Sequence, residues 1–311
     1  MNNKYNPTIS IGVVLVTFNR LSKLKIALQC FSNQTIKPEY IIVVDNASKD
    51  GTKEFLSSWQ QENDSFEKEV LFLEENTGGS GGFHSGLAAA LNRTADWIWV
   101  SDDDAFPQID ALQVFSEFAT SCGNELDSYS AVCGTVINSG NINLVHRRRT
   151  YTKGIKYYSD FVPLQEYSNP FLCNTFSYVG AILNKKKLEM VGITKKDYFI
   201  WFDDTEHSLR LSRVGKIVCL PKMKIDHNEV KPVTSFSWKT YYGLRNKLDT
   251  IREFFPWYCY LYYTFKYIFL GVEHLFWSNE KAFLYLRAVK DAFWRHFGLH
   301  AIYKPGWNSK K

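Results

Sequence analysis

Four short apolar runs in the first hundred residues constrain the fold of this chain more than any other feature. The runs are ISIGVVLV (9–16), IIVV (41–44), VLFL (70–73) and WIWV (97–100). Runs of this length are typical of strands that are buried on both faces of a sheet. Apolar residues recur at helical spacing between the first and second runs and again between the second and third. Strands that alternate with helices predict an α/β fold with a mostly parallel sheet and right-handed crossovers.

Three further runs predict strands in the second half, where a looser pattern indicates a mixed edge of the sheet. They are AVCGTVI (131–137), SYVGAIL (177–183) and KIVCL (217–221). In open sheets of this kind, ligands bind beyond the carboxyl ends of the parallel strands. Polar residues follow each of the N-terminal runs, so we expect the functional residues at that edge.

Charge and cysteine content argue against two classes of protein. The 311 residues carry a net charge of +5, and their basic residues form no block longer than three, such as Arg147, Arg148 and Arg149, so the sequence does not favour nucleic-acid binding. Six cysteines stand singly, with no CxxC pair and no secretory signal at the polar N-terminus. We therefore expect reduced thiols and a cytoplasmic protein rather than a disulfide-bonded secreted one.

Asp102, Asp103 and Asp104 follow the fourth apolar run after a single serine, Ser101. Three adjacent carboxylates repel one another and serve no packing purpose, so they indicate a positive partner. Oxygen ligands suit Mg²⁺ or Mn²⁺, which could in turn hold a diphosphate, and alternate carboxylates on an extended backbone point the same way. The alternative is a solvated acidic turn that caps the next helix.

The segment NTGGSGGFHSGL (76–87) places five glycines in nine residues between a predicted strand and a helical pattern. Glycine permits close approach of the backbone to a ligand. The spacing matches neither GxGxxG nor GxxxxGK(S/T), so neither a dinucleotide fingerprint nor a P-loop is indicated. We expect a loop that faces a sugar or a phosphate, with a tight flexible turn as the alternative.

A second acidic segment, DYFIWFDDTEHSLRL (197–211), carries Asp203, Asp204 and Glu206 at the start of a predicted helix. Carboxylates there either cap the helix or act as a general base. His227 follows the last strand-like run, and a histidine beside an acidic cluster can complete a metal site. Alone, however, such a histidine is more often structural.

The order of these segments resembles that of the family 2 glycosyltransferases of GT-A fold, within them the galactofuranosyl- and rhamnosyltransferase-like branch. The order is VVLVTFNR, VDNASKDGT, NTGGSGGFHSG, DDD, WFDDTEHSLR, His227 and YYGLRN (241–246). Each segment alone is weak evidence for this family, but the seven in this order are specific for it and span about four fifths of the chain. The resemblance implies a Rossmann-like, mostly parallel mixed sheet flanked by helices.

The resemblance also implies a role for each matched residue. The nucleotide-sugar site would comprise Thr17, Asn19, Arg20, Asp45, Asn76, Gly78, Gly79, Gly82, Asp102 and Asp103. Asp104 and His227 would hold Mn²⁺ or Mg²⁺, with Asp102 beside the metal. Asp204 would be the base that an inverting transfer needs to deprotonate the acceptor hydroxyl. The residues that bind the acceptor or hold the base in place would be Asp203, Glu206 and Trp201.

Several functions remain open at this stage. The resemblance implies transfer of galactofuranose from UDP-galactofuranose to a glycan acceptor, lipid-linked, in bacterial surface polysaccharide synthesis; dTDP-rhamnose is the alternative donor. A non-catalytic nucleotide-sugar binding module is the alternative of another class, and Asp204 argues against it because donor binding needs no base. A sugar nucleotidyltransferase is disfavoured because VTFNR stands where its Gly-Thr-Arg phosphate loop belongs.

The C-terminal segment is rich in aromatic residues and predicts a helical region that contacts a membrane surface or a protein. In 254–277 the charged residues Lys266 and Glu273 interrupt the apolar run, and a spanning helix needs about 20 largely uncharged residues. Peripheral association with the cytoplasmic membrane, packing on the catalytic domain and contact with a second subunit all fit. The predicted regions are a catalytic domain (1–240, with a nucleotide-binding half 1–100 and a metal and acceptor half 101–240) and the helical region (241–311).

Overall fold

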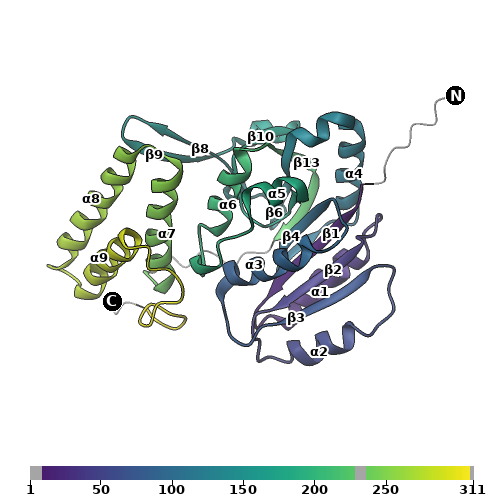
Figure 1. Ribbon diagram of the computed structural model, residues 1–311, viewed down its shortest axis with the longest axis horizontal. Helices are drawn as coiled ribbons and strands as arrows, with labels where there is room; N and C mark the ends of the chain where they lie inside the picture. Colours follow the sequence, from purple (N-terminus) through teal and green to yellow (C-terminus); the bar gives the residue numbers. More distant parts are fainter. Residues whose placement is uncertain (1–8, 228–235, 309–311) are drawn as a thin grey trace.

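The computed structural model describes residues 9–227 and 236–308, and within them a ten-stranded mixed sheet lies between helices (Figure 1). The strand order is β10-β13-β6-β12-β4-β1-β2-β3, with β5 beside β13 and β7 beside β6. The N-terminal strands are β1 (Ile11–Thr17), β2 (Tyr40–Asp45), β3 (Glu67–Phe72) and β4 (Trp97–Asp102), and they run parallel. The α/β prediction is therefore confirmed.

Successive strand residues point to opposite sides of the sheet, so alternate residues of β1 pack against two different sets of helices. Val13 and Leu15 of β1 share one buried cluster with α1 (Leu21–Ser32), α2 (Thr52–Trp59) and α4 (Ala111–Cys122). Val14 and Val16 share another with α3 (Gly78–Leu91), α5 (Lys185–Val191) and α6 (Asp203–Ser212). Burial on both faces explains why β1, β2 and β4 are continuous apolar runs.

The strands of the second half depart from the prediction in their arrangement. They are β5 (Ala105–Pro107), β6 (Tyr129–Asn138), β7 (Asn141–Ile142), β10 (Phe171–Cys173), β12 (Ala181–Asn184) and β13 (Lys216–His227). The sequence predicted mixed strand directions at an edge of the sheet, but the structure also has an antiparallel strand inside it. This strand is β12, which lies between β4 and β6. The predicted strand at 177–183 is shorter than expected because the chain turns at Gly180, where φ is +68°.

A second, three-stranded sheet was not predicted. It consists of β8 (Arg147–Lys153), β9 (Lys156–Phe161) and β11 (Thr175–Phe176). The four short 3₁₀ segments among the described residues are η1 (Gly123–Ser128), η2 (Leu144–His146), η3 (Leu164–Ser168) and η4 (Lys196–Tyr198). All six cysteines lie in the described residues and are free thiols.

Three helices form the end of the molecule beside the β8–β9 hairpin (Figure 1). They are α7 (Trp238–Phe254), α8 (Trp257–His274) and α9 (Asn279–Phe293). Of the helices in the described residues, none is both long enough and apolar enough to cross a bilayer. One buried cluster joins Phe199 to Tyr241, Tyr242 and Leu284, so packing continues across the predicted boundary at residue 240.

Candidate active site

The carboxyl ends of three parallel strands meet at one edge of the sheet and carry predicted site residues. In the strand register Thr17 pairs with Asp45, and Val16 pairs with Asp102. The loops that follow β1 and β2 are tied together, because Asn19 Oδ1 accepts a hydrogen bond from the Lys49 amide at 2.7 Å. Asp45 orders its own loop by accepting a bond from the Ser48 amide at 3.0 Å. The structure thus brings the predicted nucleotide-binding loops side by side.

The three adjacent aspartates have different surroundings. Asp103 is buried, and it accepts hydrogen bonds from the Thr17 hydroxyl at 2.8 Å and from Arg20 at 3.1 Å. Its predicted contact with the nucleotide sugar is not supported, because its side chain is only 4% exposed, against 12% for Asp104. Arg20 also donates to Asp104 Oδ2 at 2.7 Å, and Lys23, which sequence analysis missed, does so at 3.1 Å.

His227 is the last residue of β13 and lies opposite Ala105 of β5 in the register. This pairing places its Nε2 atom 3.2 Å from Asp104 Oδ1. Burial alone would raise the pKa of Asp104, but the hydrogen bond with His227 and the charge of Arg20 outweigh it and hold that pKa below its usual range. The structure therefore joins the two residues that were predicted as metal ligands from positions 123 apart in the sequence.

The donor atoms of this pair suit a divalent metal that accepts oxygen and imidazole ligands. Over residues 9–227 and 236–308, no three His, Cys, Asp or Glu side chains are grouped closely enough to hold an ion. Asp102, the predicted third ligand, therefore forms no such group with Asp104 and His227 in the described residues. Asp104 and His227 fit a metal only if a diphosphate and water supply further ligands, which is the usual manner of Mg²⁺ and Mn²⁺ binding with nucleotides.

The glycine-rich segment is the start of helix α3 rather than the loop that was predicted. A Cβ atom on Gly82 would lie 2.5 Å from Val16 Cγ1, and one on Gly86 would lie 2.4 Å from Val14 Cγ1. These glycines therefore let the helix pack closely on β1, and the predicted sugar contact of Gly82 is not supported. Gly79 has open space around its Cα and keeps the predicted role of facing a ligand.

Gly78 and Asn76 shape the turn into this helix. Gly78 has φ of +73°, and its amide donates to Asn76 Oδ1 at 2.8 Å. A Cβ on Gly78 would lie 1.9 Å from the carbonyl oxygen of Phe199, and the Ser80 amide donates to that oxygen at 3.2 Å. The glycine-rich segment therefore contacts the loop that carries the second acidic group.

The second acidic group begins helix α6. Asp203 is buried, and this burial together with the negative charge of Asp204 raises its pKa to about 8. The charge of Asp102 adds to the shift. Burial also raises the pKa of Asp204, against the positive charge of Arg148. At neutral pH the pair therefore holds a proton, mainly on Asp203.

Arg148 is a site residue that sequence analysis missed. Its guanidinium donates to the Thr205 hydroxyl at 2.8 Å, and the Thr205 amide donates to Asp204 Oδ1 at 2.5 Å. In sequence the residue belongs to a short basic block, and nothing there separates it from its neighbours. Only the β8–β9 hairpin brings it to the carboxylates.

Glu206 and Trp201 differ in their access to an acceptor. Glu206 is fully buried and ion-paired with Arg210 at 2.9 Å and Lys195 at 3.3 Å, so its predicted acceptor contact is not supported. This arrangement instead fits the alternative role of holding the start of α6 in place. Trp201 is 47% exposed and rests on α7, where a Cβ on Gly243 would come within 2.8 Å of its ring. It keeps the predicted role of a platform for a sugar.

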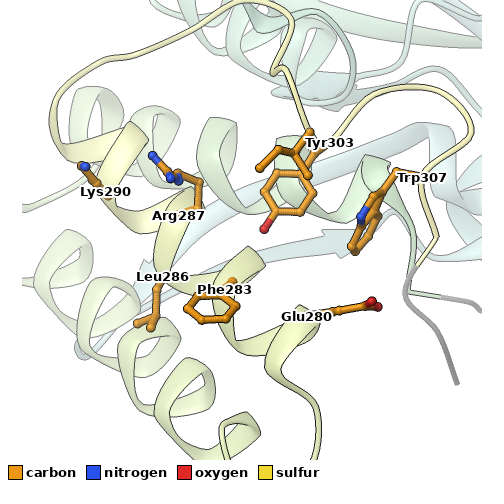
Figure 2. A pocket seen from close by; sticks show the side chains of 8 residues that line it. Glu280, Phe283, Leu286, Arg287, Lys290, Tyr303 and Trp307 are labelled. Atoms are coloured by element: carbon orange, nitrogen blue, oxygen red, sulfur yellow. The ribbon is translucent and has the colours of Figure 1, made fainter.

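A hollow of about 420 Å³ lies elsewhere, between α9 and the C-terminal segment (Figure 2). Its labelled lining combines aromatic side chains with two cations, and the residues are Glu280, Phe283, Leu286, Arg287, Lys290, Tyr303 and Trp307. None of the predicted site residues lines it. We therefore place the candidate active site at the strand ends, where the carboxylates that could do chemistry converge.

The family model described as Glycosyl transferase family 2 matches residues 12–186 of the chain. The match begins in β1, passes through the glycine-rich segment and the three aspartates, and ends in α5. This chain belongs to glycosyl transferase family 2. The resemblance of the ordered segments to this family is confirmed.

Curated relatives and solved structures agree with this membership. Galactofuranosyltransferase GlfT1 of Mycobacterium tuberculosis (strain H37Rv) is 28% identical over 214 residues, which is 67% of this chain and 66% of the relative. GlfT1 of Mycolicibacterium smegmatis is 27% identical over 209 residues, 66% of each chain. The chain thus spans just under two thirds of the length of these relatives.

Two solved glycosyltransferases share the fold at low identity. GalNAc-T7, solved with UDP, GalNAc and Mn²⁺, gives a TM-score of 0.61 at 16% identity, over 79% of this chain and 48% of that one. TarS 1-349 of S. aureus gives 0.59 at 13% identity, over 91% and 81%. At these identities the likeness shows the GT-A fold alone, and that fold prediction is confirmed.

Proposed function

We propose that this chain is an inverting glycosyltransferase that moves galactofuranose from UDP-galactofuranose to a glycan acceptor. One observation carries the proposal: the loop that leads into Asp203 and Asp204 is bonded to the glycine-rich start of α3, where the Ser80 amide donates to the Phe199 carbonyl at 3.2 Å, and the charge of Asp102 contributes to the raised pKa of Asp203. A base and a donor site therefore share one space. The GlfT1 relatives support the choice of donor, and dTDP-rhamnose remains the alternative.

The proposed reaction is a single displacement. Asp204 takes the proton of the acceptor hydroxyl, which attacks the anomeric carbon from the face opposite the diphosphate. Asp204 is the better base because Asp203 holds its proton at neutral pH. Arg20 and Lys23 offer positive charge to the diphosphate beside Asp104. A divalent metal bound by Asp104 and His227 would neutralise the charge that grows on the leaving diphosphate.

Nucleotide binding is the first prediction to test. We expect UDP with Mn²⁺ to raise the unfolding temperature of the protein more than UDP alone, because a ligand at about 100 times its Kd adds roughly 2.7 kcal/mol. The measurement is thermal unfolding with UDP, dTDP and GDP, each with and without Mn²⁺. A shift with dTDP instead would favour rhamnose as the donor sugar.

The same samples test the class of protein. A transferase also releases UDP from the donor sugar when an acceptor is present, whereas a binding module gives the thermal shift without UDP release. No shift with any of the three nucleotides would refute the proposal.

We further propose that the acceptor is lipid-linked and that the α8–α9 end binds an anionic membrane surface on the cytoplasmic side. Trp257, Phe265 and Phe269 on the outer face of α8, and Phe276 just after this helix, are exposed by 65–79% of their area. Cations that could meet anionic headgroups lie on the same two helices and just after them: Lys266 on α8, Lys281, Arg287 and Lys290 on α9, and Arg295 after α9. Aromatic side chains flanked by Lys and Arg are typical of helices that lie in the membrane interface.

The double variant Phe265→Glu with Phe269→Glu is expected to lower binding to vesicles of anionic lipid by at least 10-fold, roughly 1.4 kcal/mol or more, because it adds two negative charges and removes apolar contact. Co-sedimentation measures the effect. Ile26→Glu, an exposed position on α1, is the matched control. A wild-type protein that ignores anionic vesicles and forms oligomers would show that this face contacts a second subunit instead.

A further inference from the structure

The loop that precedes α6 has an unfavourable backbone shape. Phe199, Trp201 and Phe202 have φ of +66°, +64° and +68°. Bulky side chains rarely adopt this left-handed region, and such residues persist only where the surrounding structure holds them. Because Asp203 and Asp204 follow directly, whatever holds this loop also sets the position of the two carboxylates.

Asn246 of α7 binds this loop from the interior of the protein through its side-chain amide. Its side chain is fully buried, and the two N–H groups of its amide are shared among three carbonyl oxygens, those of Tyr198 at 3.0 Å, Ile200 at 3.1 Å and Trp201 at 2.8 Å from Nδ2. These are three of four consecutive carbonyl groups, and in an extended or helical backbone they would not converge on one amide. The contact is therefore specific to the left-handed shape of the loop.

Arg245 orients the Asn246 amide. Its Nε donates to Asn246 Oδ1 at 2.9 Å, which fixes the amide nitrogen toward the loop. One Nη atom donates to the Tyr198 carbonyl at 3.0 Å, and the other to the Gly298 carbonyl at 3.0 Å. The guanidinium is buried and thus ties the loop to both α7 and the C-terminal segment.

The opposite side of the loop rests on the donor half of the site. The Phe199 carbonyl accepts a bond from the Ser80 amide and approaches Gly78 so closely that no Cβ fits there. Asn46, at the end of β2, donates through Nδ2 to the Gly78 carbonyl at 2.8 Å. The loop is thus held between α7 and the glycine-rich segment.

We propose that Asn246, oriented by Arg245, is a positioning residue that sets the place of Asp204 relative to the nucleotide sugar. The inference rests on the proposed function and gives a role to the YYGLRN segment, which the sequence resemblance named without one. It also makes α7 part of the catalytic machinery rather than of an appended membrane-binding region.

Asn246→Asp isolates this role. The variant keeps an oxygen for Arg245 but cannot donate to the loop carbonyls, and it places a negative charge against them. Because displacement of a reacting group by about 1 Å can cost roughly 100-fold, we expect kcat to fall by about that factor. We expect the KM for the donor and the Mn²⁺-dependent affinity for UDP to remain at wild-type values. Hydrogen exchange of the amides at 199–206 should become faster.

Asn184→Asp is the matched control, because Asn184 is also buried and donates to one backbone carbonyl, that of Tyr129, far from the loop. It should retain wild-type kcat and loop exchange. Wild-type kcat and exchange in Asn246→Asp would overturn the proposal, as would equal losses in the two variants. If Asn246→Asp does not fold, Arg245→Lys decides, because it removes the Nε contact and should lower kcat in the same direction.

Hydrogen exchange also separates this proposal from the proposed function. If the wild-type protein transfers no sugar but Asn246→Asp speeds amide exchange only at 199–206, Asn246 does hold the loop and the transferase assignment fails. If the wild-type protein transfers sugar but Asn246→Asp leaves the exchange at 199–206 unchanged, Asn246 does not hold the loop and the transferase assignment stands.

Discussion

Asp204→Asn is expected to lower kcat for sugar transfer by about 10³-fold while the affinity for UDP and Mn²⁺ stays unchanged. An asparagine keeps the shape of the side chain and an oxygen that accepts from the Thr205 amide. It cannot accept the proton of the acceptor hydroxyl, and general base catalysis contributes roughly 10²- to 10⁴-fold. Initial rates at saturating donor, together with UDP binding, measure the effect.

Asp203→Asn is the control for this prediction. Because burial and Asp204 raise the pKa of Asp203 to about 8, this carboxyl is protonated at neutral pH, and an amide resembles that form. We expect a loss of no more than about 10-fold, as for a group that does not transfer the proton itself. A larger loss in Asp203→Asn than in Asp204→Asn would exchange the two roles, and full activity in Asp204→Asn would remove the base assignment.

Arg147→Leu should lower the free energy of unfolding by about 3–5 kcal/mol, since removing one partner of a buried charged interaction leaves other polar groups unpaired. Arg147 is fully buried at the start of β8. Its guanidinium donates to backbone carbonyls at 2.7–3.1 Å, namely those of Gly134, His146, Val179 and Gly180. A leucine at this position would remove all four of these hydrogen bonds, although the carbonyls of His146 and Gly180 would keep a backbone donor, from Ser177 and Gly134 respectively.

Arg149→Leu is the matched control, two residues along the same strand. Arg149 is 42% exposed and pairs with Glu166 at the surface, so its loss should cost no more than about 1 kcal/mol. Urea denaturation of both variants gives the comparison. Equal changes in the two variants would show that burial of Arg147 contributes nothing specific to stability.

The parts of the fold that were predictable are those whose burial leaves a pattern in the sequence. β1, β2 and β4 are buried on both faces and appear as apolar runs. β3 begins earlier than predicted, at Glu67, because it is an edge strand whose first residues are polar and only partly buried. The β8–β9 hairpin was missed because its strands are largely polar and half exposed, so they show no apolar run.

The candidate site was predictable where carboxylates or histidine stand at the ends of strands. Asp104 and His227 were predicted as partners, and the structure places them in contact. Arg148 and Asn246 were given no role, since they act on a hydroxyl and on backbone carbonyls whose positions depend on the folded chain. Gly82 was misassigned because a glycine required for helix–sheet packing looks the same in sequence as one that faces a ligand.

The cluster that joins Phe199 to Tyr241, Tyr242 and Leu284 has a consequence for how this chain can diverge in evolution. Substitutions on the inner faces of α7 and α9 change the packing against the loop before Asp203. The set of residues tolerated there is therefore limited by the positions that the two carboxylates need. The outer face of α8 shares no side chain with that cluster. Substitutions on that face can therefore change what α8 contacts without altering the packing behind the loop that carries Asp203 and Asp204.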